Sequence, residues 1–217
     1  MHYRWIIPAG CILALLIIGE RVAVSKISNR LTLYAFQRDY EAYQRLRKKW
    51  YTLYLFHPFN LAYMDLNVAL FKGDLKEIEN CFLQFDQMHL NKKQKETVYR
   101  KAFYYNVMKN EKENAEHYYH MLKDMEQPQR MQDIEIFYDT FIHSGYRFMD
   151  EVQQALKKCS KEYRADYESI LAKMYENKGD LQSADEYQKL AETHFEELKQ
   201  NQRRKGGTIC ETKRFSW

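Results

Sequence analysis

Apolar side chains recur at helical spacing along most of the chain. One stripe follows the i, i+3, i+4, i+7, i+8 spacing of an α-helix face; it consists of Tyr167, Ile170, Leu171, Met174 and Tyr175. A second stripe comes after Gly179-Asp180 and consists of Leu181, Ala184, Tyr187, Ala191 and Phe195. Gly adopts the left-handed conformation that ends many helices, and Asp caps the start of the next helix. The pattern predicts two helices joined by a tight turn.

This turn pattern returns at near-equal intervals. The matching stretches begin at residues 38, 73, 110, 145 and 179, which lie 35, 37, 35 and 34 positions apart. In the first copy Arg38 replaces the Gly, and in the fourth Asp150 stands where a small residue is expected. Shifting the fourth copy by two residues aligns Val152 and Leu156, which predicts a longer turn around Tyr146–Met149. A helix pair of this size cannot bury its apolar face alone, so neighbouring pairs are expected to stack.

The period and the residues within it resemble the tetratricopeptide repeat (TPR). The fifth copy has small residues where the helices would cross and an aromatic in its first helix: Leu171-Ala172, Tyr175, Gly179-Asp180, Ala184, Tyr187 and Ala191. The second copy is similar, with Ala62, Ala69, Gly73-Asp74, Ile78 and Phe82. The resemblance covers roughly residues 24–198. It implies an all-α fold, a TPR-like α-solenoid of about five helix–turn–helix units.

An uncharged run near the N-terminus predicts a membrane anchor. Residues 5–19 contain no charge, and Val22-Ala23-Val24 extends the apolar stretch. About twenty residues cross a hydrocarbon core of about 30 Å, which this segment reaches if Arg4 and Arg21 snorkel. Two alternatives stay open: a signal peptide cleaved near Ala23-Val24-Ser25, and a lipoprotein signal at Cys11. We expect a single transmembrane helix within residues 1–24, in contact with the membrane through residues 5–24.

The charges that flank this segment suggest an orientation. Arg4 precedes it, whereas Arg21, Lys26 and Arg30 follow it, and positive residues favour the cytoplasmic side. Four cysteines, Cys11, Cys81, Cys159 and Cys210, show no paired spacing and form a poor disulfide framework. Both features favour a cytoplasmic repeat domain.

Composition and charge narrow the possible classes. Only 7 Gly and 3 Pro occur in 217 residues, which argues against an all-β fold rich in turns. With 45% hydrophobic and 15% aromatic residues, most of the chain is not disordered. The net charge of +4 comes from the two ends, while residues 31–198 carry an excess of acid. Such a body is not expected to bind nucleic acid, and basic ends beside an apolar segment suit a membrane surface.

The domain organisation expected from these patterns has three parts. Residues 1–24 form the membrane anchor, residues 25–205 form the TPR-like repeat domain, and residues 206–217 form a flexible basic tail that starts at Gly206-Gly207. The basic run Arg45-Leu46-Arg47-Lys48-Lys49 lies early in the repeat domain. It either meets anionic headgroups or is a solvated helix face.

In TPR domains the first helix of each pair lines a concave groove that holds peptides. Carried over to this chain, the resemblance implies these partner-binding residues: Asn60, Tyr63, Asn67, Arg100, Tyr104, Glu135, Asp139 and Lys173. Polar groups can pair with a peptide backbone, and aromatic rings give contact area. The alternative is that these positions are solvated helix faces. One TPR variant clamps a C-terminal carboxylate with Lys and Asn; here Asn67 matches, but Tyr63 stands where the Lys is expected.

Metal and catalytic sites have little support in the sequence. His117 and His120 lie three residues apart near Glu113 and Glu116, but no further ligand of a zinc site is evident. Cys81 and Cys159 lie on apolar stripes and are expected to pack as small hydrophobic residues, and the sequence contains no glycine-rich phosphate loop. We expect no cofactor and no metal.

These observations predict a single-pass, membrane-tethered scaffold that binds a protein or peptide through a TPR-like groove. It is expected to act by recognition and not as an enzyme. Two alternatives stay open. In the first alternative the chain is a structural or assembly subunit that associates with itself. In the second it is an enzyme with an unrecognised site.

Overall fold

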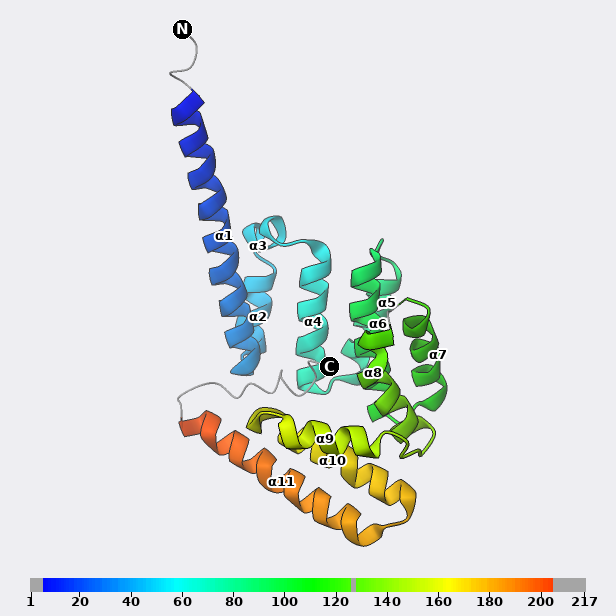
Figure 1. The fold of residues 1–217 in the computed structure, drawn as a ribbon. Coiled ribbons are helices and arrows are strands. Elements are labelled where there is room, and N and C mark those ends of the chain that lie inside the picture. The colour runs from blue at the N-terminus through cyan, green and yellow to red at the C-terminus, as the bar shows by residue number, and fades with distance from the viewer. Residues whose placement is uncertain (1–5, 126–127, 205–217) are drawn as a thin grey trace. The chain divides into compact units, whose positions relative to one another are not determined.

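The structure is a computed structural model that describes residues 6–125 and 128–204, with side chains for residues 17–125 and 130–200. All regular structure in these ranges is helical (Figure 1), so the all-α class is confirmed. The helices form two compact units, residues 1–88 and 89–217, which are described separately.

Unit 1 contains the first two predicted hairpins and one helix that was not predicted. Its helices are α1 (Ile6–Phe36), α2 (Tyr40–Arg47), α3 (Trp50–Leu55), α4 (Pro58–Lys72) and α5 (Leu75–Asp86). Helix α1 packs against α2 and α3, and α4 packs along α5. One buried cluster joins the two hairpins through Leu31, Tyr43 and Val68. The short helix α3 lies in the connection between the hairpins, where periodicity gave no signal.

Unit 2 contains the other three hairpins. Its helices are α6 (Lys92–Met108), α7 (Lys112–Lys123), α8 (Pro128–Phe137), a π-helical turn η2 (Tyr138–Ile142), α9 (Met149–Lys158), α10 (Lys161–Lys178) and α11 (Leu181–Arg204). Helix α6 packs along α7, and α10 packs along both α9 and α11. The predicted stripe of α10 is largely confirmed, because Ile170, Leu171 and Met174 are buried against Val152. Leu181 differs from its prediction, since it is 68% exposed.

Each hairpin turn contains one residue with left-handed backbone. The described part of the chain has positive φ at five positions: Arg38 (58°), Gly73 (67°), Asn110 (58°), Ser144 (54°) and Gly179 (86°). The five predicted reversals are therefore confirmed, with the fourth centred on Ser144, one residue before Gly145. Three of the five residues are not glycine, so the turn conformation is kept even where a Cβ makes it unfavourable.

The same hydrogen bonds close four of these turns. The N–H after the left-handed residue donates to the carbonyl five positions earlier, which satisfies a carbonyl left open at the helix end. The pairs are Asp39 to Tyr34 (2.9 Å), Asp74 to Ala69 (3.3 Å), Glu111 to Asn106 (2.9 Å) and Asp180 to Tyr175 (3.0 Å). The Asp39, Asp74 and Asp180 carboxylates also accept an N–H from the first turn of the next helix. The predicted Asp caps are confirmed.

The fourth hairpin departs from this geometry. Its closing bond runs from the Gly145 N–H to the Asp139 carbonyl (2.7 Å), six residues apart, and the π-helical turn η2 contains the extra residue. Helix α9 then begins only at Met149, so the predicted longer turn is confirmed. A Cβ built on Gly145 would lie 2.4 Å from the Asp139 carboxylate. The φ of Gly145 is not positive, so the close approach of the Asp139 side chain, and not the backbone conformation, favours glycine here.

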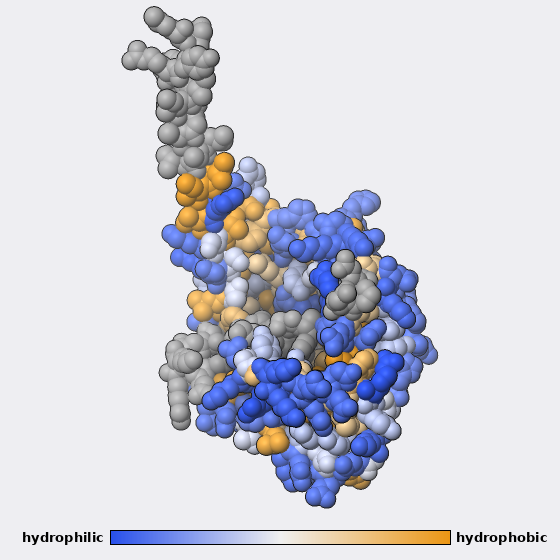
Figure 2. Space-filling model, viewed as in Figure 1, coloured by the Kyte–Doolittle hydropathy of each residue, from blue (hydrophilic) through white to orange (hydrophobic). Residues whose placement is uncertain are grey.

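The membrane segment receives no support from the structure. No helix in the described part of the chain combines the length and apolar character needed to cross a membrane. Of the predicted segment 5–24, only residues 17–24 have described side chains. Three of these are exposed apolar residues on α1, Ile17, Ile18 and Val22, and Figure 2 shows hydrophobic side chains on this part of α1.

Two of the predicted domain boundaries can be compared with the helices and with the described residues. The boundary at residue 24 falls inside α1, which continues unbroken to Phe36. The predicted basic tail, residues 206–217, lies outside the described residues.

The hairpin turns can be tested by paired substitutions. Gly179→Ala should destabilise the protein by about 1–2 kcal/mol, because a Cβ is unfavourable in left-handed backbone. No atom lies within 4 Å of a Cβ built there, so the loss comes from the backbone alone. Arg38→Gly should stabilise by about 0.5–1 kcal/mol, since relief of strain exceeds the added chain entropy. Urea unfolding followed by circular dichroism measures both; changes of the same sign would contradict the shared conformation.

Candidate binding groove

Unit 2 contains a groove of about 260 Å³ between α8, α9 and α10. Its floor is apolar, because Val152 and Ile170 are buried. Aromatic rings from α8 and α10 contribute to its walls, and polar side chains lie at its rim. The lining residues are Gln132, Asp133, Ile136, Phe137, Glu151, Val152, Ala155, Tyr167 and Ile170. The groove thus combines an apolar floor with exposed polar side chains at its rim.

The unusual fourth hairpin accounts for the position of this groove. In the second, third and fifth hairpins the two helices pack along each other, whereas α9 packs along α10. The extra residue of η2 and the connection at residues 143–148 separate α9 from α8 (Figure 1). The Asn177 side chain fixes this connection from α10 by donating to the Thr140 carbonyl (2.8 Å) and the Gly145 carbonyl (3.0 Å). The groove therefore results from the geometry of this turn and from the hydrogen bonds that hold it.

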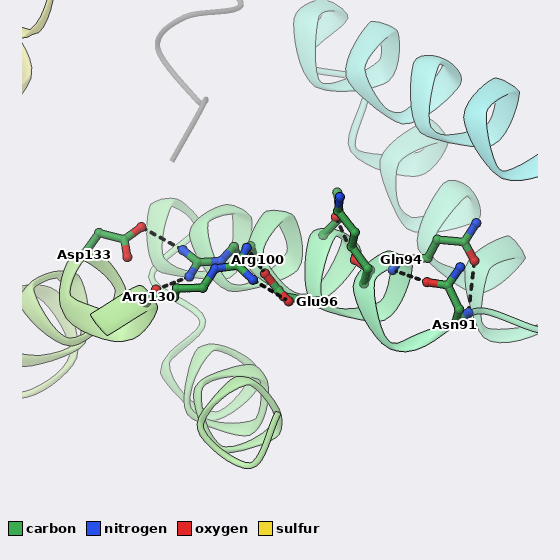
Figure 3. A network of polar contacts seen from close by, with 8 residues as sticks. Asn91, Gln94, Glu96, Arg100, Arg130 and Asp133 are labelled. Carbon is green, nitrogen blue, oxygen red and sulfur yellow. Dashed lines mark hydrogen bonds and ion pairs between the residues drawn. The ribbon is translucent and has the colours of Figure 1, made fainter. Parts of the chain in front are cut away.

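One groove residue, Asp133, is held by the preceding hairpin. Its Oδ2 accepts from Arg100 Nη1 (2.8 Å) and from the Tyr104 hydroxyl (2.9 Å), both on α6. Arg130 makes a second ion pair with α6, from Nη2 to Glu96 Oε1 (2.6 Å). Figure 3 shows Glu96, Arg100, Arg130 and Asp133 between the two helices. Arg100 also donates to the Arg130 carbonyl. The network fixes the first helix of one hairpin against that of the next.

A related arrangement occurs in unit 1, with the Tyr and the Arg on the second helix of the preceding hairpin instead of the first. Asp65 on α4 accepts from the Tyr43 hydroxyl (2.8 Å) and pairs with Arg47 (2.9 Å), both on α2 of the preceding hairpin. In each case a Tyr and an Arg four positions apart share one Asp, so we call both arrangements the Tyr–Arg–Asp cluster. Burial, together with the Asp65 carboxylate, raises the pKa of Tyr43. The hydroxyl therefore stays a donor at all physiological pH values.

Two of the sequence-predicted binding residues belong to this cluster. Tyr104 is only 5% exposed, and its ring contacts Phe137 edge-on with centroids 4.9 Å apart. The Arg100 side chain is 15% exposed. Neither residue lines the groove, and their contacts to it run through Asp133 and Phe137, which do.

The remaining predicted residues are spread over both units. Asn60, Tyr63 and Asn67 share one face of α4; Asn60 is exposed, while Tyr63 is half-buried and stacks on Phe59. Burial raises the pKa of Tyr63. Helix α4 belongs to unit 1, so this face is not part of the groove of unit 2. Whether any of these residues binds a partner stays a prediction.

In unit 2 the other three predicted residues lie outside the groove lining. Glu135 is half-buried on α8. Asp139 accepts the Arg147 N–H (3.1 Å) and so belongs to the fourth turn. Lys173 pairs with Glu176 on its own helix (2.9 Å).

The sequence did not reveal most of the groove residues. Tyr167 and Ile170 were assigned to the apolar stripe of their helix, which is correct, but the same stripe also lines the groove. Asp133 and Glu151 look like ordinary surface acids in a chain with 29% charged residues. The irregular fourth copy was the only feature of the sequence that pointed to this region. It predicted the longer turn, and the groove lies beside that turn.

The groups considered for metal or thiol chemistry do not form a site in the structure. His120 lies 4.0 Å from Glu116 on its own helix. Among the described residues, no group of three or more potential ligands could hold a metal ion. Cys81 is buried on α5, and burial raises its thiol pKa to about 11, so it is a poor nucleophile near neutral pH.

Comparison of the chain with known proteins gives no match: no family model, no curated protein and no solved structure shows detectable similarity to it. The resemblance to TPR proteins therefore depends on the residues and on the hairpin geometry described above.

The Tyr–Arg–Asp clusters predict large effects of single substitutions. Asp133→Ala or Asp65→Ala should destabilise the protein by about 1–3 kcal/mol, because each leaves a partly buried Arg and Tyr without their shared acceptor. Asp185→Ala is the matched control: its pair with Lys189 has side chains 61% and 71% exposed, so a change below about 0.5 kcal/mol is expected. Urea unfolding measures all three, and equal effects would show that the clusters are ordinary surface pairs.

Proposed function

We propose that this protein is a membrane-tethered, TPR-like helical scaffold that binds a segment of a partner protein in the groove of unit 2. It acts by recognition and not by catalysis. The groove at the fourth hairpin is the observation that supports this proposal most directly.

The size of the groove favours a protein segment over a small molecule. Pockets for small ligands usually enclose about 300–1,000 Å³, whereas this groove has about 260 Å³. That volume suits one or two side chains of a longer segment whose backbone lies across the rim. Val152 and Ile170 provide the apolar floor for such a side chain, and Gln132 and Glu151 at the rim offer hydrogen-bonding groups to the backbone.

A TPR-like α-solenoid is supported by the five hairpin turns, which recur at near-equal intervals. Each reverses at one left-handed residue, and buried alanines allow close helix approach, as at Ala69, Ala115 and Ala191. Neighbouring hairpins are connected by the Tyr–Arg–Asp clusters at two places. Stacked hairpins of this kind provide extended surfaces for protein segments.

The membrane tether is supported by the sequence of α1. Residues 5–19 carry no charge, and Ile17 and Ile18 at the end of this run are exposed, as is Val22 after Glu20 and Arg21. Arg21, Lys26 and Arg30 follow within α1, which favours the repeat domain on the cytoplasmic side.

Site-specific photo-crosslinking tests the groove. A benzophenone amino acid replaces Gln132 at the rim or, as the matched control, Gln154, which is exposed on α9 but does not line the groove. In cells that express the full chain, we expect one partner adduct from position 132 and not from position 154. Ala155→Phe, which fills the groove, should reduce that adduct about tenfold, a loss of about 1.4 kcal/mol in binding.

Three outcomes would contradict the groove assignment. In the first, positions 132 and 154 give the same adducts. In the second, neither position gives an adduct. In the third, the adduct from position 132 persists in the Ala155→Phe variant. An adduct to a second copy of this chain would instead favour a self-associating subunit.

A further inference from the structure

Helix α3 presents an unusual set of exposed side chains. Trp50 is 76% exposed, Leu53 is 52% exposed and Tyr54 is 82% exposed. Their i, i+3, i+4 spacing places them on one face of the helix. The opposite side is fixed to unit 1, because Thr52 is fully buried and its hydroxyl donates to the Leu46 carbonyl (2.9 Å). The contacts of Thr52 therefore fix the orientation of α3, with its apolar face toward the outside of unit 1.

Positive charge lies next to this face. Lys48 and Lys49 directly precede α3 and are exposed, and the stretch from Lys48 to His57 contains no acidic residue. Trp and Tyr are the side chains enriched at membrane–water interfaces, and Lys is attracted to anionic headgroups. The combination has the chemistry of an interfacial membrane contact.

The position of α3 along α1 gives a second, independent argument. Helix α3 packs against α1, and Figure 1 shows it beside the middle of α1, at the end of unit 1 from which the N-terminal half of α1 extends. The stretch from Ile6 to Val22 measures about 25 Å as a helix, close to a hydrocarbon core of about 30 Å. If the run 5–19 is in the bilayer, α3 lies at the level of the headgroups.

We infer that the Trp50–Leu53–Tyr54 face of α3 and the adjacent Lys48 and Lys49 dock onto the surface of a bilayer that contains anionic lipids. This inference rests on the proposed membrane tether. The contact gives unit 1 a second attachment beside α1, which restricts how the unit can rotate and tilt about its anchor.

Tryptophan fluorescence of the full chain in lipid vesicles tests this contact. Trp5→Phe and Trp217→Phe leave Trp50 as the only tryptophan. In vesicles of phosphatidylcholine and phosphatidylglycerol, bromine atoms placed near the headgroup end of the acyl chains should quench most of the Trp50 emission. The emission maximum of Trp50 in these vesicles should also lie at shorter wavelength than that of the same chain unfolded in urea without detergent.

The matched control moves the tryptophan within the same unit. Leu75→Trp, combined with Trp50→Phe, places it at a position that is 52% exposed and lies beyond the far end of α4, which is about 22 Å long. This tryptophan should remain unquenched. Lys48→Gln with Lys49→Gln should reduce quenching of Trp50 several-fold in vesicles that contain phosphatidylglycerol, and little in phosphatidylcholine alone.

Other results would overturn the inference and show which step failed. If the chain resists carbonate extraction from the vesicles but Trp50 stays unquenched, α3 does not touch the bilayer and the tether stands. If carbonate releases the chain, the tether and the α3 contact both fail. A shift to shorter wavelength without quenching by bromine would mean that protein, for example a second copy, covers this face. None of these results bears on the groove of unit 2.

Discussion

Each of the five hairpin turns in the described part of the chain depends on one residue that adopts left-handed backbone between two helices. That residue lets the next N–H reach back to a carbonyl that the helix end would leave open, and it starts the following helix in the opposite direction. Because the reversal is a backbone requirement, Arg38, Asn110 and Ser144 adopt it despite their Cβ atoms. The strain is tolerated because the apolar faces of both helices become buried only after the chain has turned.

The fourth hairpin shows what happens when this geometry changes by one residue. The π-helical turn adds a residue before Ser144, so the closing hydrogen bond spans six positions, from Gly145 to Asp139. The following helix then packs on α10, and the space beside α8 becomes a groove with an apolar floor. π-Helical turns cost backbone hydrogen bonds and are frequent at functional sites. Here Asn177 supplies a side-chain donor to the carbonyls of the turn, which stabilises the opening.

The sequence predicted the features that depend on local chemistry. Gly73-Asp74 and Gly179-Asp180 each combine a residue that ends a helix with a residue that caps the next, and both turns lie where they were expected. The position of Arg38 was also correct, because the period identified a turn that the residue type alone would not. Helix α3 was missed, since six residues are too few to show a helical period.

The candidate site was harder to predict because it depends on contacts between hairpins. Arg100 and Tyr104 were selected as groove residues from their positions in the repeat, yet both bind Asp133 and do not line the groove themselves. Asp133 lies 29 residues after Tyr104 in the sequence, and no local pattern connects them. A similar cluster at Tyr43, Arg47 and Asp65 connects the second helix of one hairpin to the first helix of the next, so the same side-chain chemistry joins hairpins at different positions.

The tyrosines explain how a chain with so many polar helices can stack in this way. A leucine between two hairpins fills space only, whereas a tyrosine fills space with its ring and orients the next helix with its hydroxyl. Tyr43 and Tyr104 each donate to an Asp on the following hairpin, and Tyr138 donates to Glu116 on the preceding one (3.0 Å) while its ring stacks on Tyr119. These directed contacts limit how far one hairpin can slide along its neighbour. The groove lies between the fourth and fifth hairpins, where the Tyr175 hydroxyl of α10 accepts from Gln153 of α9 (2.9 Å) and Asn177 of α10 donates to the Thr140 and Gly145 carbonyls. These bonds fix α10 relative to the helices that form the other walls.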